Sequence, residues 1–194
     1  LDNINEDYVL TFLEDGILNE IVDNNKFQYY LDEFVKLDMN YLCLKDYPKP
    51  TKISDEKQYG IIHNNVNYRC SIAFSLWKTK FLRKMLFKNE SAWEFEINGT
   101  ARSRNIDNFY SSDNEFFKAD HVIVKGYIQR SIYKKLKSTN ELDKIHSFEL
   151  MPLNIHLKEL IIILRGKILK LFPIKFQTKI RNIFYKYIFK ENFK

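Results

Sequence analysis

The chain has 194 residues, of which 45% are hydrophobic and 15% aromatic. This composition excludes a disordered chain, and the length allows one domain with a sizeable core but not two full ones. The net charge is +6, but ten Lys/Arg residues and two acidic residues fall within 157–194. A basic tail therefore follows a slightly acidic domain. Because a nucleic-acid binder spreads its positive charge across a face, we expect no nucleic-acid partner.

The ends of the chain and its cysteines bear on its origin. The sequence begins at Leu1 rather than methionine, without a basic-then-apolar signal segment, so we expect a fragment of a longer chain. Cys43 and Cys70 lie in apolar runs without metal-ligand spacing, and the four histidines are scattered. We expect buried reduced thiols in a cytoplasmic protein rather than a disulfide or a zinc site.

The first predicted element is a short buried strand over 8–13, which ends at the acidic pair Glu14 and Asp15. In open α/β sheets, ligands gather at the carboxyl ends of strands. Adjacent carboxylates at such an end are hard oxygen ligands that suit magnesium or manganese. A solvated charged turn is the alternative interpretation of the pair.

A helix and a second strand are predicted after the first strand, in the order of a βαβ unit. Apolar residues at helical spacing predict a helix over 25–37, with Asp23 or Asn24 as its N-cap. A second buried strand is predicted over 41–44, before a stretch with two prolines. Strand, helix and strand within this span are typical of an α/β protein, so a mixed α/β class is predicted.

The remaining segments up to the tail are assigned from the same patterns. A helix over 75–88 would put four large apolar side chains on one face: Trp77, Phe81, Leu82 and Met85. The other predicted elements are strands over 59–62, 66–72 and 121–124, a helix over 129–137, and loops over 93–104 and 105–118.

The predicted loop over 93–104 is where several reactive side-chain types crowd together. Glu94 and Glu96 would share a face if the segment is extended, so both could point at one site. Trp93 could provide a stacking surface, and two arginines, Arg102 and Arg104, follow. A base, a platform and anion-binding cations suit a catalytic site. A core tryptophan beside solvated acids is the alternative.

The tail contains two apolar stretches, over 158–172 and 175–190, with lysines interspersed. Neither offers the roughly 20 uninterrupted apolar residues of a transmembrane helix. A basic amphipathic helix rich in Phe and Tyr favours the surface of an anionic membrane. A helix docked on its own domain or on a partner is the alternative.

Four stretches together resemble a family of bacterial glycosyltransferases from capsule, lipopolysaccharide and other surface-glycan loci. The similarity covers about residues 6–130 and leaves the tail outside it. The stretches, in chain order, are YVLTFLEDGILNEIVD, YLCLKDYPKP, YRCSIAFSLWKTKFLRKMLFKNESAWEFEINGTARSR and HVIVKGYI.

The resemblance implies a partial GT-A-like fold, a mixed sheet with flanking helices that binds a nucleotide sugar. It implies that an N-terminal part holding most of the nucleotide site is missing. Residues 1–150 would form the remaining catalytic portion, and residues 151–194 the basic amphipathic tail. The implied partners are a nucleotide-sugar donor and a glycan or lipid-linked acceptor, at the inner face of the cell membrane.

The resemblance also implies roles for matched residues. Glu14 and Asp15 match the acidic motif that holds manganese or magnesium, although the family usually has two aspartates there. Glu94, and next Glu96, match the motif with the catalytic base. Lys125 matches a Lys-Gly near the end of the family's core. The chemistry of sugar transfer then makes Trp93 a candidate platform for a sugar face, and three cations become candidates for contact with the diphosphate: Arg102, Arg104 and Lys125.

These observations predict an enzyme that transfers a sugar to a bacterial surface glycan. The alternative is a non-enzymatic module that binds a membrane surface or a partner, built on a degenerate fold.

Overall fold

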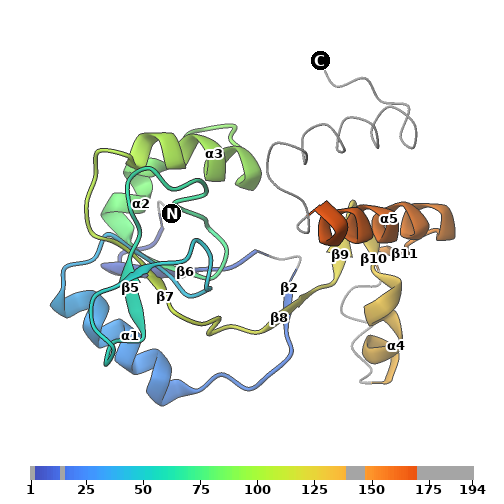
Figure 1. The fold of residues 1–194 in the computed structure, drawn as a ribbon, viewed down its shortest axis with the longest axis horizontal. Coiled ribbons are helices and arrows are strands. Elements are labelled where there is room, and N and C mark those ends of the chain that lie inside the picture. The colour runs from blue at the N-terminus through green and yellow to red at the C-terminus, as the bar shows by residue number, and fades with distance from the viewer. Residues whose placement is uncertain (1–2, 14–15, 139–146, 170–194) are drawn as a thin grey trace. The chain divides into compact units, whose positions relative to one another are not determined.

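The computed structural model describes residues 3–13, 16–138 and 147–169 (Figure 1). They belong to two compact units, 1–122 and 123–194. The boundary expected at residue 150 lies inside the second unit.

The first unit contains a mixed six-stranded sheet in the order β1-β6-β3-β7-β5-β4. Strands β3 and β7 are parallel, and the other neighbours in this sheet are antiparallel. A separate antiparallel pair is formed by β2 and β8. The strands are β1 (Tyr8–Thr11), β2 (Gly16–Leu18), β3 (Tyr41–Cys43), β4 (Thr51–Lys52), β5 (Tyr59–Ile61), β6 (Ser75–Lys78), β7 (Phe109–Ser112) and β8 (Ala119–His121). The mixed α/β class is therefore confirmed.

Helices cover both faces of this sheet, which makes three layers (Figure 1). One face packs against α1 (Asn24–Lys36), in a cluster that includes Phe34, Leu42 and Leu76. The other face packs against α2 (Thr79–Met85) and α3 (Ala92–Ser103), in a cluster that includes Trp77 and Phe95. Alternate side chains of each central strand therefore point to opposite faces of the sheet and pack into two separate hydrophobic clusters.

Helix α1 and strands β1 and β3 form as the sequence predicts. The Asp23 side chain accepts a hydrogen bond from the Lys26 backbone N–H at 3.0 Å, so Asp23 is the N-cap. Tyr30 and Phe34 lie one helical turn apart and are both buried. Strands β1 and β3 run in the same direction, and β6 lies between them.

Three predictions in the centre of the chain are wrong. The N-terminal part of the predicted helix over 75–88 is strand β6, because Leu76 and Trp77 are buried on opposite faces of the sheet. The predicted strand over 66–72 is irregular, and the predicted loop over 105–118 contains the central strand β7. Short buried strands carry no period of their own, so sheet pairing decides these segments.

The segment predicted as a loop over 93–104 is mainly helix α3. Its N-terminus carries a capping box: the Ser91 hydroxyl oxygen accepts from the Glu94 N–H, and the Glu94 carboxylate accepts from the Ser91 N–H. This Ser-x-x-Glu pattern is a sequence signature of a helix start. The helix then buries Phe95 and Gly99 against the sheet.

The second unit has a three-stranded sheet in the order β11-β10-β9 and two helices. Its elements are β9 (Ile123–Val124), β10 (Tyr127–Ile128), α4 (Arg130–Ser138), β11 (Glu149–Leu150) and α5 (Leu153–Leu169). The helix predicted over 129–137 is thus confirmed. Among the described helices, none is long and apolar enough to cross a bilayer. The predicted helix over 175–190 lies outside the described residues.

Candidate active site

One edge of the six-stranded sheet gathers the polar and aromatic groups that suit a site. Thr11 at the end of β1 and Cys43 at the end of β3 both pair with Ser75 at the start of β6. Strand β7 also ends here, since Ser111 pairs with Cys43. We call this end of the sheet, where β1, β3 and β7 end, the carboxyl edge. It is the side on which open α/β sheets bind ligands.

Glu96 lies at this edge. Its Oε1 atom accepts a hydrogen bond of 2.6 Å from the Ser71 hydroxyl, in the segment that leads into β6. The Ser71 backbone N–H in turn donates to the Tyr41 hydroxyl at 3.1 Å. Both Ser71 and Glu96 are half-buried. The Glu96 carboxylate is therefore held in one orientation while part of it stays accessible.

Aromatic rings and a lysine lie at the same edge. The Lys45 ammonium is 4.5 Å from the centre of the Phe74 ring. Phe12, just after β1, meets the same ring edge-on with centroids 5.2 Å apart. The Tyr47 and Tyr68 rings lie 6.4 Å apart and are 60% and 42% exposed. Exposed tyrosines in a pair offer an apolar surface with polar rims.

Glu94 has a different environment from Glu96. Its carboxylate accepts from both the Ser91 N–H and the Ser91 hydroxyl, at 2.8 and 2.7 Å. These hydrogen bonds hold the pKa of the exposed Glu94 carboxyl below its ordinary value. In a helix, residues two apart point in nearly opposite directions, so Glu94 and Glu96 do not share a face. The expected shared face required an extended segment.

Of the other residues predicted in this segment, two are exposed on the surface and one, Arg102, makes an ion pair within the chain. Trp93 is 64% exposed at the start of α3. Arg102 donates to both Glu90 carboxylate oxygens at 2.7 Å, and its guanidinium lies 4.5 Å from the Phe87 ring centre. Arg104 is exposed at the C-cap of α3. The paired Arg102 ties the loop before α3 to the helix.

Lys125 belongs to the second unit, in the turn between β9 and β10. Its ammonium lies 2.7 Å from a Glu159 carboxylate oxygen on α5. The Lys125 side chain is 63% exposed. The structure thus gives Lys125 a partner within its own unit.

The predicted metal ligands Glu14 and Asp15 lie outside the described residues. The residues on either side of them, Leu13 and Gly16, are described. A Cβ on Gly16 would lie 3.6 Å from the Phe74 ring, which belongs to the carboxyl edge. Within the described ranges, no three His, Cys, Asp or Glu side chains group together as a metal site.

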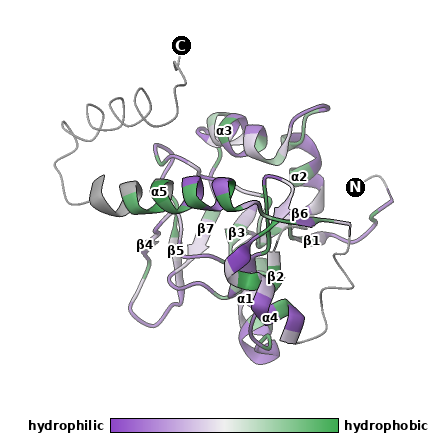
Figure 2. Cartoon of the chain, turned by 90° about the vertical axis from the view of Figure 1, so that its right-hand side faces the viewer, coloured by the Kyte–Doolittle hydropathy of each residue, from purple (hydrophilic) through white to green (hydrophobic). Residues whose placement is uncertain are grey.

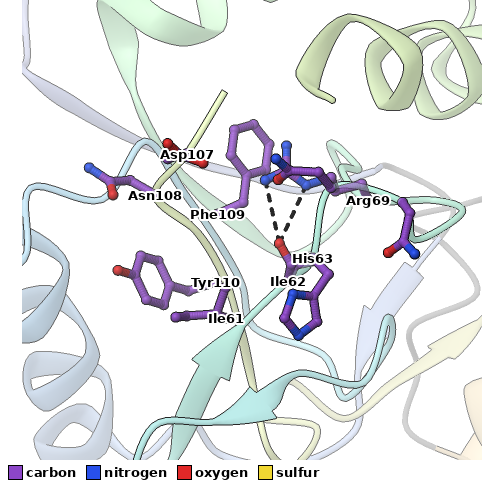
Figure 3. Close-up of a pocket in the computed structure, with 10 residues that line it drawn as sticks. Ile61, Ile62, His63, Arg69, Asp107, Asn108, Phe109 and Tyr110 are labelled. Atoms are coloured by element: carbon purple, nitrogen blue, oxygen red, sulfur yellow. Dashed lines mark hydrogen bonds between the residues drawn. The ribbon is translucent and has the colours of Figure 1, made fainter. Parts of the chain in front are cut away.

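A cavity of about 450 Å³ lies at the opposite end of the strands, where β7 begins (Figure 3). None of the predicted site residues lines it; its walls come from 61–65, Arg69 and 107–110. The Arg69 guanidinium projects beside it, but each of its three nitrogens already donates to a backbone carbonyl. His63 bonds the Thr51 hydroxyl at 2.8 Å. The Arg69 guanidinium and the His63 imidazole are therefore both held by hydrogen bonds within the chain.

Sequence reasoning missed four residues of the carboxyl edge: Lys45, Tyr47, Tyr68 and Ser71. A signal exists for Tyr47, an aromatic in a polar, proline-flanked stretch where no core helix or strand is expected; Tyr68 was assigned instead to the predicted strand over 66–72. Ser71 carries no such signal, because only the fold brings it to Glu96. In comparisons with protein families, curated proteins and solved structures, nothing matches this chain.

Proposed function

We propose that the chain is the catalytic portion of a glycosyltransferase, which moves a sugar from a nucleotide-sugar donor to a bacterial surface glycan. The observation that supports this proposal is the carboxyl edge. It combines the oriented Glu96 carboxylate with the exposed Tyr47 and Tyr68 rings. Glu14 and Asp15 follow β1 in the chain by a few residues, and β1 ends at the same edge.

Glu96 is the proposed general base. It would take the proton from an acceptor hydroxyl as that oxygen bonds to the anomeric carbon of the donor sugar. The bond from that carbon to the diphosphate breaks, and the nucleoside diphosphate leaves with the bonding electrons. Ser71 fixes the carboxylate by its hydrogen bond to Oε1. Glu94 is the weaker candidate, because both of its hydrogen-bonding interactions serve the helix cap.

The leaving diphosphate needs positive charge. Lys45 lies at the carboxyl edge and is 24% exposed; its ammonium contacts the Phe74 ring and makes a long 3.7 Å ion pair with Glu115, a residue that is itself 43% exposed. A lysine so held can contact a phosphate as a point charge. Glu14 and Asp15 have the hard oxygen ligands that a magnesium or manganese ion prefers. Such an ion would neutralise charge on the diphosphate.

Tyr47 and Tyr68 would receive a sugar face. Pyranose rings present C–H groups that pack against aromatic faces, while phenol hydroxyls at the rim bond sugar hydroxyls. The pair suits either the donor sugar or the glycan acceptor. We assign to this pair the role that the sequence suggested for Trp93, which is a single exposed ring at the start of α3.

The test is nucleotide release from a panel of uridine, guanosine and cytidine nucleotide sugars with manganese or magnesium. Glu96→Gln and Glu94→Gln form a matched pair on one helix. We expect Glu96→Gln to lower the rate of release about a hundredfold or more, with an unchanged donor Kd. Glu94→Gln should keep the rate and lower the melting temperature.

Equal rates in the two variants would remove Glu96 as the base, and a selective loss in Glu94→Gln would restore the prediction made from the sequence. Absence of both donor binding and turnover, in the present chain and in a chain extended at its N-terminus, would overturn the enzyme proposal. The non-enzymatic module would then be favoured.

A further inference from the structure

Helix α5 exposes a continuous row of large apolar side chains. Residues 153, 157, 160, 161 and 164 recur at the spacing of one helical face. Their exposed fractions are high for leucine and isoleucine, from 37% to 62%. We call this row the leucine stripe: Leu153, Leu157, Leu160, Ile161 and Leu164. In Figure 2, bands of hydrophobic colour recur along α5 between hydrophilic ones.

The other side of α5, which carries both polar and apolar residues, faces its own unit. Ile155, His156 and Glu159 are half-buried, and the Glu159 carboxylate pairs with Lys125 in the β9–β10 turn. A small cavity of about 260 Å³ in this unit is lined from α5 by His156, Glu159, Leu160 and Ile163, so Leu160 lies at the border between the stripe and the cavity. An ordinary surface helix turns its apolar face inward. The leucine stripe stays exposed although apolar residues of α5 also face the unit, so the stripe is a surface for something else.

The charge that follows the stripe identifies the chemistry of its partner. Residues 170–194 contain seven Lys/Arg and one acidic residue, so this segment accounts for the whole +6 of the chain. Lys158, on the flank of the stripe, is exposed. Leucines beside concentrated positive charge match a surface that is apolar inside and anionic outside. A bilayer with anionic headgroups has both properties.

We infer that α5 docks on an anionic lipid bilayer, with the leucine stripe inserted among the acyl chains, and the positive charge of the sequence after α5 favours anionic headgroups. The helix lies in the plane of the interface, since no described helix is long and apolar enough to span. A second copy of the chain is the alternative occupant, and the measurement of oligomeric state below separates the two. The leucine stripe and the positive charge of the sequence after α5 each favour membrane binding, and neither alone is sufficient for stable binding.

The test is co-sedimentation of the 194-residue chain with vesicles of phosphatidylcholine alone or mixed with phosphatidylglycerol. The double variant Leu157→Gln/Leu164→Gln removes apolar area from the stripe without changing charge. Its matched control is Ile53→Gln/Ile97→Gln, at two exposed isoleucines of the first unit (48% and 44%). Circular dichroism confirms that each variant is folded.

We expect the wild type and the control to bind mixed vesicles and to bind phosphatidylcholine far more weakly. The stripe variant should lose about tenfold or more in partition coefficient. As a second measurement, a tryptophan at the stripe (Leu157→Trp) should be quenched by brominated lipids, whereas Ile53→Trp should not. Neither readout needs a sugar substrate, so the inference stands or fails independently of the proposed activity.

Three results would overturn the inference. Unchanged binding of the stripe variant would mean that the basic segment alone holds the lipid. Absence of vesicle binding by a chain that elutes as a dimer would assign the stripe to a second copy. Absence of binding by a monomer, with Leu157→Trp already shielded from aqueous quenchers, would show that the chain covers its own stripe.

Discussion

The Arg69 guanidinium donates a hydrogen bond from Nη1 to the backbone carbonyl of Ser103, the last residue of α3. Arg69 is 1% exposed, and its Nη2 also donates to the Ile106 carbonyl at 2.9 Å. Carbonyls at the C-terminal end of a helix carry partial negative charge, which a cation offsets. Burial lowers the pKa of the Arg69 side chain from its ordinary value. Arg69 thus fastens the end of α3 to the sheet.

Replacing Arg69 by methionine should destabilise the first unit by about 3 kcal/mol. The substitution keeps the apolar stem but removes the guanidinium hydrogen bonds to the Ile62, Ser103 and Ile106 carbonyls. Urea unfolding followed by tryptophan fluorescence measures the loss. The control is Arg104→Met at an exposed position, which should change stability by less than about 0.5 kcal/mol. Equal losses in the two variants would contradict the role of Arg69.

Ser91→Ala should cost about 1 kcal/mol, because it removes the side-chain half of the α3 capping box. Ser91→Thr should restore most of the stability, since threonine offers the same hydroxyl. Hydrogen bonds from Ser91 lower the pKa of Glu94. The Glu94 contribution is therefore complete above the ordinary glutamate pKa and is lost as pH falls through the lowered one. Thermal unfolding of the three proteins at neutral and acidic pH checks both effects.

The sequence predicts those parts of the fold that rest on local patterns. Asp23 caps α1 as expected, because an N-cap depends only on its own helix. The Ser-x-x-Glu signal at Ser91 was equally local, and reading it would have identified α3. Strand β6 was mistaken for helix because Leu76 and Trp77 are buried on both faces, which erases the alternation of a half-buried strand.

The candidate site depends on long-range pairing, and the sequence indicates only part of it. Glu96 was recognised as a candidate from its neighbours in the chain. Its hydrogen bond to Ser71, 25 residues away, follows from the packing of α3 beside the start of β6. The partners of Arg102 and Lys125, Glu90 and Glu159, were likewise not predicted, since an ion pair leaves no periodic pattern.

The buried thiols should react slowly in the native protein. Cys43 and Cys70 are free and almost fully buried, as the sequence predicted. Burial raises the pKa of Cys70 to about 12 and also raises that of Cys43, so little thiolate is present at neutral pH. Reaction with a chromogenic disulfide should require unfolding, with both thiols titrating at once in denaturant. Prompt reaction of either thiol in the folded chain would contradict the packed environment.

A buried carboxylate should make stability depend on pH. Glu33 on α1 accepts hydrogen bonds from the Lys57 ammonium and the Tyr59 hydroxyl, and these lower the pKa of Glu33. The stabilisation is complete above the ordinary glutamate pKa and is lost as pH falls through the lowered value. Glu33→Gln should flatten the acidic side of the melting-temperature profile. Glu20→Gln, at an exposed salt bridge, should leave the profile unchanged.

The same cluster predicts a loss of stability at alkaline pH. Burial and the adjacent Glu33 raise the pKa of Tyr59 above its ordinary value near 10. A raised pKa gives stability that is present below the ordinary tyrosine value and is lost as pH rises through the folded one. Tyr59→Phe should lower the melting temperature at neutral pH and reduce the alkaline dependence, to which Tyr30 and Tyr41 also contribute because burial raises the pKa of each. An ultraviolet titration should show that Tyr59 ionises only with unfolding.

Lys125 offers a test that separates turn geometry from ligand binding. Lys125 and Gly126 form the two-residue loop between Val124 and Tyr127, and both have positive φ angles, 54° and 78°. Asn-Gly is the preferred pair for such a hairpin, whereas a β-branched residue is strained there. Lys125→Asn should therefore keep or slightly raise the stability of the second unit, because the exposed pair with Glu159 contributes little. Lys125→Val should lower it by about 1 kcal/mol or more. Hydrogen exchange of the Tyr127 and Ile128 amides measures both changes locally.

If Lys125 also contacts the diphosphate, the well-folded Lys125→Asn variant will show a raised KM for the nucleotide sugar. An unchanged KM would leave Lys125 a purely structural role in the turn.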